Sequence, residues 1–273
     1  MVLEHQYGAT LLASLLTGDP LPELGDDVTP AVVRFQASAV SAVDDLLISG
    51  STPDGGTRQA SVGVRRAPKL IKSEATSADG GGKTVRLVAS YLKVVAGAWE
   101  EIVAGRWRLV LAAVPWSAAA RQAGELAEIA RAIGSEKAFR DELDQGVHDQ
   151  SLRDRLVHLD GLVHAATGTG CDSGGLSAGE LTWRWLFSMR VRELRLEGAD
   201  TTDRTFAIAR LRAITADGTA AAAEVLFSKL EGLSSSYAPA GAIVDEGSLR
   251  RDLSGSRLAR SSRYPGHGPC WTG

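Results

Sequence analysis

Apolar residues recur along the first part of the chain with two different periods. Residues 5–17 carry apolar side chains at helical spacing, and "VTPAVVRFQAS" follows as a strand candidate. The segments "VDDLLISG" and "RQASVGVRR" flank "STPDGG", a turn in which proline presets φ and glycine accepts a positive φ. These patterns predict a helix, a strand and then a β-hairpin. The helix rests on Tyr7, Leu11, Leu12, Leu15 and Leu16.

Helical patterns dominate the rest of the sequence. "KTVRLVASYLKVVAGAWEEIVAG" predicts a helix, and "WRLVLAAVPW" is a continuous apolar run typical of a buried strand. Ser117 is the expected N-cap of a helix that ends near Gly134. "SAGE" at 177–180 has the capping-box pattern and opens a helix expected to continue through "LTWRWLFSMRVRELRLEG". Further helices are expected over 135–145, 149–166 and about 203–214, and in "DGTAAAAEVLFSKLEGLSSSYAP" and "DEGSLRRDLSG".

The order of these elements is helix, three strands, helix, strand, and then helices only. Such an order predicts an α/β (α+β) fold, with a small mixed sheet flanked by helices and followed by an all-helical lobe. We expect the α/β core over 1–133, the helical lobe over 134–253 and a disordered basic tail over 254–273. A chain of 273 residues has ample length for this core.

Composition narrows the class of protein only slightly. The net charge is −3, so any anion-binding surface must be local rather than a property of the whole chain. Cys171 and Cys270 match neither a zinc spacing nor a disulfide framework, which favours a reducing cytoplasm. No apolar run is long enough for a membrane span, and the first residues lack the pattern of a signal peptide, so no membrane partner is expected.

The order of elements over roughly residues 4–116 resembles the restriction-endonuclease-like core of the PD-(D/E)XK superfamily. More specifically, it is similar to nuclease modules at the N-termini of bacterial defence proteins, and it rests more on element order than on motifs. The resemblance implies an acid in the first helix, an Asp at the start of the second strand and (E/D/Q)-x-Lys on the third. The carboxylates would hold Mg²⁺ through oxygen ligands, and the lysine would position or activate the attacking water.

Two acidic positions of this chain match the resemblance. Glu4 in "LEHQYG" would be the helix acid, and Asp44 or Asp45 in "VDDLL" would be the strand acid and the Mg²⁺ ligand. The alternative is that the two aspartates are ordinary polar residues at a strand start. Because side chains alternate along a strand, one of them must then face the core side and the other solvent.

The third motif departs from the resemblance. "GVR" (Gly63, Val64 and Arg65) stands where "QVK" is expected. Glycine offers only its backbone carbonyl, and the arginine stays protonated and cannot act as a base. Lys69 or Lys72 is the alternative source of the catalytic lysine. The sequence therefore predicts the outline of a metal site without the residue that handles the proton.

Arginines supply the candidate contacts to phosphate. In "LTWRWLFSMRVRELRLEG" they line one face of the expected helix, and guanidinium groups donate bidentately to phosphate. The alternative is a solvated amphipathic helix, in which Glu180, Glu193 and Glu197 pair with these arginines. "RRDLSGSRLARSSR" adds a second basic segment. The candidate nucleic-acid-binding residues are Arg65, Arg66, Arg184, Arg192, Arg195, Arg250 and Arg251.

Three classes of function follow. The first is a nucleic-acid-binding recognition or regulatory module on a nuclease-like scaffold, which binds double-stranded DNA without cleaving it. The second is a Mg²⁺-dependent DNA endonuclease of a defence system, with Glu4, Asp44 or Asp45, and a relocated Lys69 as its catalytic residues. The third is a protein-interaction adaptor, which binds a partner protein or a C-terminal domain beyond this chain. The missing lysine favours the first class over the second, and the net charge favours the third over the first.

Overall fold

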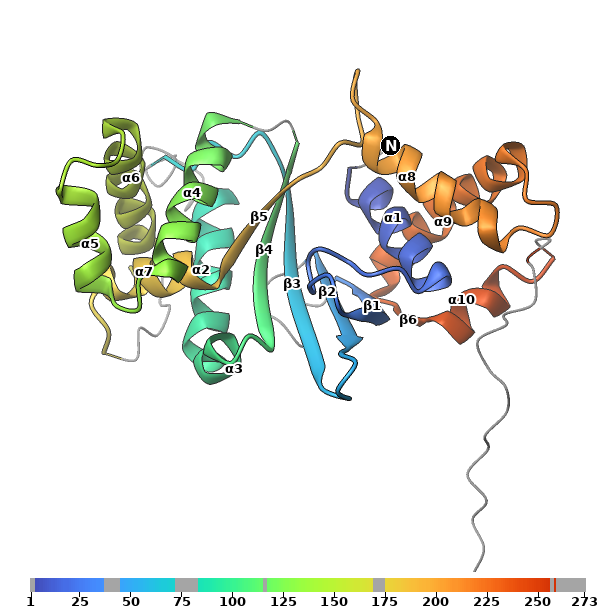
Figure 1. Cartoon of the computed structure of the whole chain (residues 1–273), viewed down its shortest axis with the longest axis horizontal. Coiled ribbons are helices and arrows are strands. Elements are labelled where there is room, and N and C mark those ends of the chain that lie inside the picture. Colours follow the sequence, from blue (N-terminus) through green and yellow to red (C-terminus); the bar gives the residue numbers. More distant parts are fainter. Residues whose placement is uncertain are drawn as a thin grey trace, which may run out of the picture.

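The computed structural model describes residues 3–36, 45–71, 83–114, 117–168, 175–255 and 258. These residues form a mixed six-stranded sheet with a group of helices on either side (Figure 1). The strand order is β5-β4-β3-β2-β1-β6. The first three strands form an antiparallel meander, whereas β3, β4 and β5 run parallel. The strands are β1 (Thr29–Phe35), β2 (Leu46–Ser51), β3 (Thr57–Arg66), β4 (Trp107–Val114), β5 (Met189–Glu193) and β6 (Ile243–Asp245).

Two hydrophobic cores lie on the two faces of this sheet. The first core joins the sheet to α1 (Leu3–Thr17), α8 (Thr202–Leu211), α9 (Ala220–Ala240) and α10 (Glu246–Asp252). A short 3₁₀ helix, Arg212–Ile214, follows α8. The second core joins it to α2 (Lys83–Gly97), α3 (Trp99–Val103), α4 (Ala118–Ala132), α5 (Glu136–Asp144), α6 (Gln150–Thr167) and α7 (Ala178–Ser188). The two groups of helices stand on opposite sides of the strands in Figure 1.

The helix predicted at the start of the chain, the hairpin, and the buried strand at Trp107–Val114 are confirmed. Thr52 and Gly56 close the hairpin turn through a backbone hydrogen bond of 2.9 Å, and Gly55 takes a φ of +83° that favours glycine. Ser117 and Ser177 cap α4 and α7 as expected. The helix expected from Lys83 onward is divided at Ala98 into α2 and α3.

The helix expected to run from residue 177 through 198 is wrong in its second half. Helix α7 ends at Ser188, and the next five residues form β5 beside β4. The reason is an alternation within "MRVRE": Met189 and Val191 pack in the second core, while Arg190 and Arg192 face the other side. The strand also pairs backbone groups on the edge of β4 that a helix would leave open.

The predicted all-helical lobe over 134–253 is therefore wrong as well. This region contributes β5 to one edge of the sheet and β6 to the other, where β6 pairs with β1. Of the predicted tail over 254–273, only Ser254, Gly255 and Leu258 are described, and Leu258 forms an isolated bridge with Thr215. Asp44, Cys171 and Cys270 also lie outside the described residues. Within the described ranges, every helix is too short or too polar to cross a bilayer.

Candidate functional site

The structure brings together Glu4, Asp45 and Arg65, which the sequence places on three different elements. Asp45 immediately precedes β2, and its Oδ2 accepts hydrogen bonds from the Val64 backbone N–H at 2.6 Å and from Nη1 of Arg65. The two ion-paired side chains are 15% and 29% exposed. Partial burial raises the pKa of Glu4, the charge of Asp45 raises it further, and Arg65 lowers it. The three groups therefore share one electrostatic environment.

The raised pKa of Glu4 has a consequence for stability. A carboxyl whose folded pKa exceeds its unfolded one stabilises the fold only below the unfolded value, about 4.3, and loses this contribution as pH rises through the folded pKa. Near neutral pH, Glu4→Gln should therefore make the protein about 0.5 kcal/mol more stable, a value kept small by the exposure of the side chain. The gain should vanish below the unfolded pKa. Urea unfolding near neutral pH and below the unfolded pKa measures this change in the free energy of unfolding, with Glu100→Gln as an exposed control. A loss of stability near neutral pH would contradict the raised pKa of Glu4.

Gly63 stands where the resemblance requires a third metal ligand, and packing excludes a side chain there. A Cβ on Gly63 would lie 2.7 Å from Oη of Tyr91 and 2.9 Å from Cδ1 of Leu87. The Tyr91 hydroxyl is fixed because it donates a hydrogen bond of 2.7 Å to the Val110 carbonyl. Burial also raises the pKa of Tyr91, so that the phenol stays protonated. Tyr91 on α2 thus fills the space that a carboxylate at position 63 would need.

The described residues at this position do not fit Mg²⁺. Among them, Glu4 and Asp45 are the carboxylates, and the Arg65 guanidinium already binds one oxygen of Asp45. Octahedral Mg²⁺ prefers several oxygen ligands and is repelled by a fixed cation at the same oxygen. In the described parts of the chain, no three His, Cys, Asp or Glu side chains gather closely enough to hold a metal ion.

Lys69 lies in the segment that leaves the end of β3. Its backbone carbonyl, and that of Leu70, accept hydrogen bonds from Nη1 of Arg155 on α6 at 3.1 and 2.8 Å. Ser117 binds the neighbouring carbonyl of Pro68. The exposed Lys69 side chain makes no hydrogen bond or ion pair with another described residue. The backbone at Lys69 is thus held toward α4 and α6, and Lys72 lies outside the described residues.

Most of the other candidate arginines are paired with carboxylates of the same chain. The acids at 180, 193 and 197 that the sequence offered as partners all take part. Arg184 also lies over the ring of Trp99, 4.5 Å from its centroid. Hydrogen bonds from Ser248 lower the pKa of Asp245, and the charge of the exposed Arg251 lowers it further. The pairs are Arg66 with Glu197, Arg184 with Glu180, Arg192 with Asp203 and Glu23, Arg195 with Glu193 and Asp200, and Arg250 with Glu246.

A polar cleft of about 110 Å³ lies between α1 and α8. Within it, the buried Tyr7 hydroxyl donates to Glu23 at 2.7 Å, and Arg192 donates to Asp203 at 3.0 Å. Burial and the Glu23 carboxylate raise the pKa of Tyr7, which keeps this hydroxyl a donor. Arg192 thus ties the end of β5 to the loop after α1 and to α8, and it acts as a structural residue.

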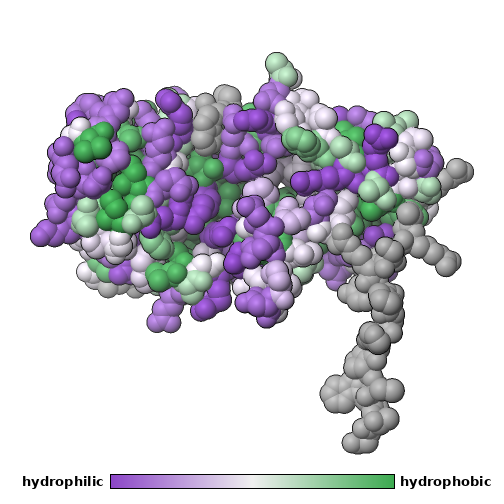
Figure 2. All heavy atoms as spheres, viewed as in Figure 1, coloured by the Kyte–Doolittle hydropathy of each residue, from purple (hydrophilic) through white to green (hydrophobic). Residues whose placement is uncertain are grey.

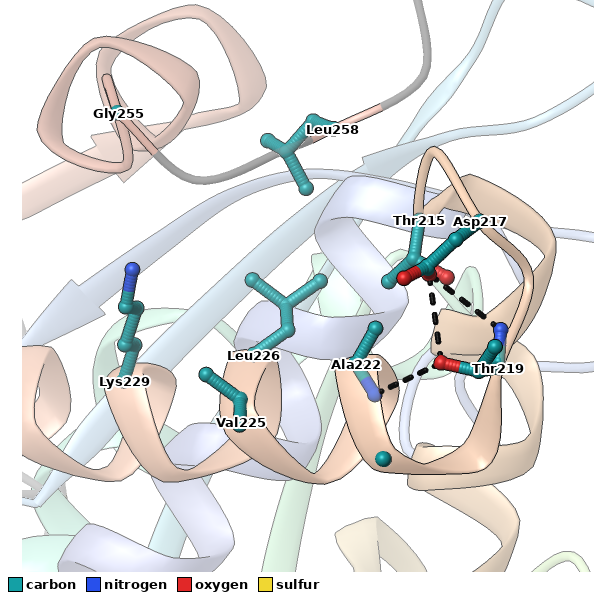
Figure 3. A pocket seen from close by; sticks show the side chains of 10 residues that line it. Thr215, Asp217, Thr219, Ala222, Val225, Leu226, Lys229, Gly255 and Leu258 are labelled. Atoms are coloured by element: carbon teal, nitrogen blue, oxygen red, sulfur yellow. Dashed lines mark hydrogen bonds between the residues drawn. The ribbon is translucent and has the colours of Figure 1, made fainter.

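A wider groove of about 370 Å³ runs beside α9 (Figure 3). Val225, Leu226 and Leu258 line its apolar part, whereas Asp217 and Thr219 lie at one end. These polar groups cap the N-terminus of α9, because the Thr219 hydroxyl accepts a hydrogen bond from the Ala222 N–H at 3.2 Å and donates one to Asp217 at 3.4 Å. The groove contains no pair of groups arranged for acid–base or nucleophilic chemistry among its described lining residues.

Comparison with known proteins finds no relative from which a function could be inferred, so the function is argued from the geometry of the sites described above. No family model, no curated protein and no solved structure matches the chain. The cluster of Glu4, Asp45 and Arg65 is the site that both the sequence and the structure indicate. Tyr91 belongs to it and was not predicted, although "YLKVV" carries it on the buried face of the helix that follows the hairpin.

Proposed function

We propose that this chain is a nucleic-acid-binding recognition or regulatory module on a restriction-endonuclease-like scaffold, and that it binds double-stranded DNA without cutting it. The observation that carries the proposal is the ion pair between Asp45 and Arg65. An arginine bound to the strand acid supplies a fixed positive charge where a nuclease of this class would hold Mg²⁺ beside its lysine. Such a site keeps its geometry without a metal ion and is unable to activate water.

The order of elements supports this scaffold. A helix with an acid in its first turn, a three-stranded meander, a helix and a parallel strand follow one another as the resemblance implies. Asp45 at the start of β2 and Arg65 on β3 meet in space, as the corresponding nuclease residues are expected to do. The endonuclease alternative requires a third ligand and a lysine beside Asp45. Packing at Gly63 opposes the third ligand.

One observation favours the adaptor as a second candidate. The arginines expected to contact phosphate are mostly neutralised by carboxylates within the chain, so they add little to a positive surface. A protein that only docks another protein has no need of unpaired cations. The two candidates differ in one measurable property, because DNA binding through phosphates weakens steeply with salt and protein docking through apolar contacts does not.

Gel analysis of a labelled DNA duplex separates all three candidates. The chain is incubated with the duplex in Mg²⁺, in Mn²⁺ and in EDTA, and each sample is resolved on native and denaturing gels. We expect a salt-sensitive shift on the native gel and an intact duplex on the denaturing gel in every condition. Metal-dependent cutting that Asp45→Ala abolishes would establish the endonuclease instead. The absence of both a shift and cutting would leave the adaptor.

A further inference from the structure

Three arginines form a diagonal row across the parallel strands. In the register of the sheet, Arg108 on β4 pairs with Ala60 on β3, and Arg190 on β5 pairs with Val110 on β4. Arg58 lies two residues before Ala60, and Arg108 lies two before Val110, so all three arginine side chains leave the same face. The strand spacing and rise place neighbouring members about 8 Å apart at the backbone. We call Arg58, Arg108 and Arg190 the arginine row.

The arginine row lies where β3, β4 and β5 begin, at one end of the sheet (Figure 1). It shares its face with the core residues that pack against α1. A Cβ on Gly25, in the loop after α1, would lie 2.8 Å from Nη1 of Arg58 and 3.4 Å from Nη1 of Arg108. Two guanidinium groups therefore reach the same point. In the view of Figure 2, strongly hydrophilic residues gather over the strands between the two groups of helices.

The row holds more positive than negative charge. Arg58 is paired with Asp27 at 2.7 Å. Arg108 makes no hydrogen bond or ion pair with its side chain, and Arg190 donates only to the carbonyls of Phe187 and Met189, at 3.4 and 3.2 Å, among the residues described. Two members of the row thus lack a carboxylate partner, which sets them apart from the arginines predicted from the sequence.

The acids near the row do not remove this excess. Asp27 and Asp26 act on Arg108 from the loop after α1, and Glu128 acts on Arg190 from α4. Glu128 is itself paired with Arg131, whose Nη1 also binds the Met189 carbonyl. Arg131 therefore adds a further positive charge beside the row, and its own partner is already engaged.

Like charges and burial disfavour the protonated form of both unpaired arginines. Burial lowers the pKa of Arg108, and the charge of Arg58 lowers it further. Burial and the charges of Arg131 and Arg108 lower the pKa of Arg190 to about 10. Each side chain is nevertheless partly exposed, so solvent and ligands can reach it. A bound anion would relieve this repulsion, because it supplies the negative charge that the chain does not.

We propose that Arg108 and Arg190, flanked by Arg58, form a binding site for backbone phosphates of nucleic acid. This inference rests on the proposed function and assigns its phosphate contacts to residues that the sequence did not single out. Arginine suits the task because its planar guanidinium donates two parallel hydrogen bonds to one phosphate. A diagonal row contacts successive phosphates and carries no base preference of its own.

The arginine row is separate from the pair of Asp45 and Arg65. Arg58 and Arg65 are seven positions apart on β3, which amounts to about 23 Å along an extended strand. The two arginines also leave opposite faces, because their positions differ by an odd number of residues. Phosphate binding at the arginine row therefore does not depend on the pair of Asp45 and Arg65, and either can be changed by mutation without the other.

Duplex binding by the full chain, measured by fluorescence anisotropy between about 50 and 200 mM salt, tests the assignment. The test variant is Arg108→Gln/Arg190→Gln. The control is Arg121→Gln, which removes an exposed charge from α4 that makes no side-chain hydrogen bond or ion pair with the described residues. The slope of log affinity against log salt should become shallower by about 0.9 for each row arginine, about 1.8 for the double variant. The control should retain the wild-type slope.

Other results of this binding experiment distinguish a failure of the arginine row from a failure of the proposed function. If the wild type binds DNA and the double variant keeps its slope, the row is not the phosphate site, while the proposed function stands. If the wild type binds no DNA, the proposed function fails and the row loses its ligand. Circular dichroism verifies folding, and Arg108→Lys/Arg190→Lys provides a second variant. It should keep the wild-type slope but bind more weakly, because lysine cannot donate bidentately; unchanged affinity contradicts the assignment.

Discussion

Gly63→Glu, which restores a carboxylate at the third position of the metal motif, should unfold the protein rather than create a nuclease. The new Cβ would meet Oη of Tyr91 at 2.7 Å and Cδ1 of Leu87 at 2.9 Å in a fully buried layer. Overpacking alone costs about 1–3 kcal/mol, and an unpaired buried carboxylate costs about 3–5 kcal/mol more. We expect a loss of at least about 4 kcal/mol in the free energy of unfolding, measured by urea denaturation.

Smaller changes separate the steric cause from the charge. Gly63→Ala should cost about 2 kcal/mol, and Tyr91→Phe should recover part of that loss because it removes the hydroxyl nearest to the new Cβ. The control is Gly97→Ala at the end of α2, where an added Cβ meets nothing within 4 Å and should change stability by less than about 0.5 kcal/mol. A stable Gly63→Glu protein would show that position 63 has room for a ligand.

Arg65→Met should destabilise the protein by about 2 kcal/mol. Asp45 is 15% exposed, and without the guanidinium its carboxylate keeps only the Val64 N–H and faces Glu4. Losing a charged hydrogen bond at a partly buried site costs about 1.5–3 kcal/mol. Asp45→Asn should restore part of this stability in the Arg65→Met background, because the remaining amide carries no charge to repel Glu4.

A double-mutant cycle measures the coupling between Asp45 and Arg65. We expect a coupling free energy of about 1–2 kcal/mol from urea unfolding of the two single variants and the double variant. The matched control is the exposed pair of Glu101 and Arg106, for which a coupling below about 1 kcal/mol is expected. Equal coupling in the two cycles would mean that the Asp45–Arg65 pair is an ordinary surface contact.

The sequence predicts the elements of the fold well wherever one period dominates. Helix α1, the hairpin of β2 and β3, and strand β4 each have a single clear pattern, and each forms where expected. It fails at "MRVRE", which satisfies a helical period when read with the preceding residues and a strand period by itself. Only the open edge of β4, a feature of the folded sheet, decides between them.

The candidate site shows the same division between local and distant causes. Glu4, Asp45 and Arg65 could be named from the sequence because they lie at defined points of a helix, a strand start and a strand end. The contact between Tyr91 and Gly63 could not, since it depends on how α2 packs across the sheet. The arginine row depends on the register of three strands, one of which was predicted as a helix. Ion pairing between Arg66 and Glu197 spans 131 residues, beyond any local pattern.

The most direct test of the account is the affinity of a labelled DNA duplex for the wild type and for Asp45→Asn, each measured by fluorescence anisotropy in Mn²⁺ and in EDTA. Because Arg65 supplies the positive charge at Asp45 and the phosphate contacts lie elsewhere, we predict that the two proteins have the same dissociation constant within each condition. Tighter binding in Mn²⁺ that Asp45→Asn abolishes would contradict it, since Asp45 would then hold a metal.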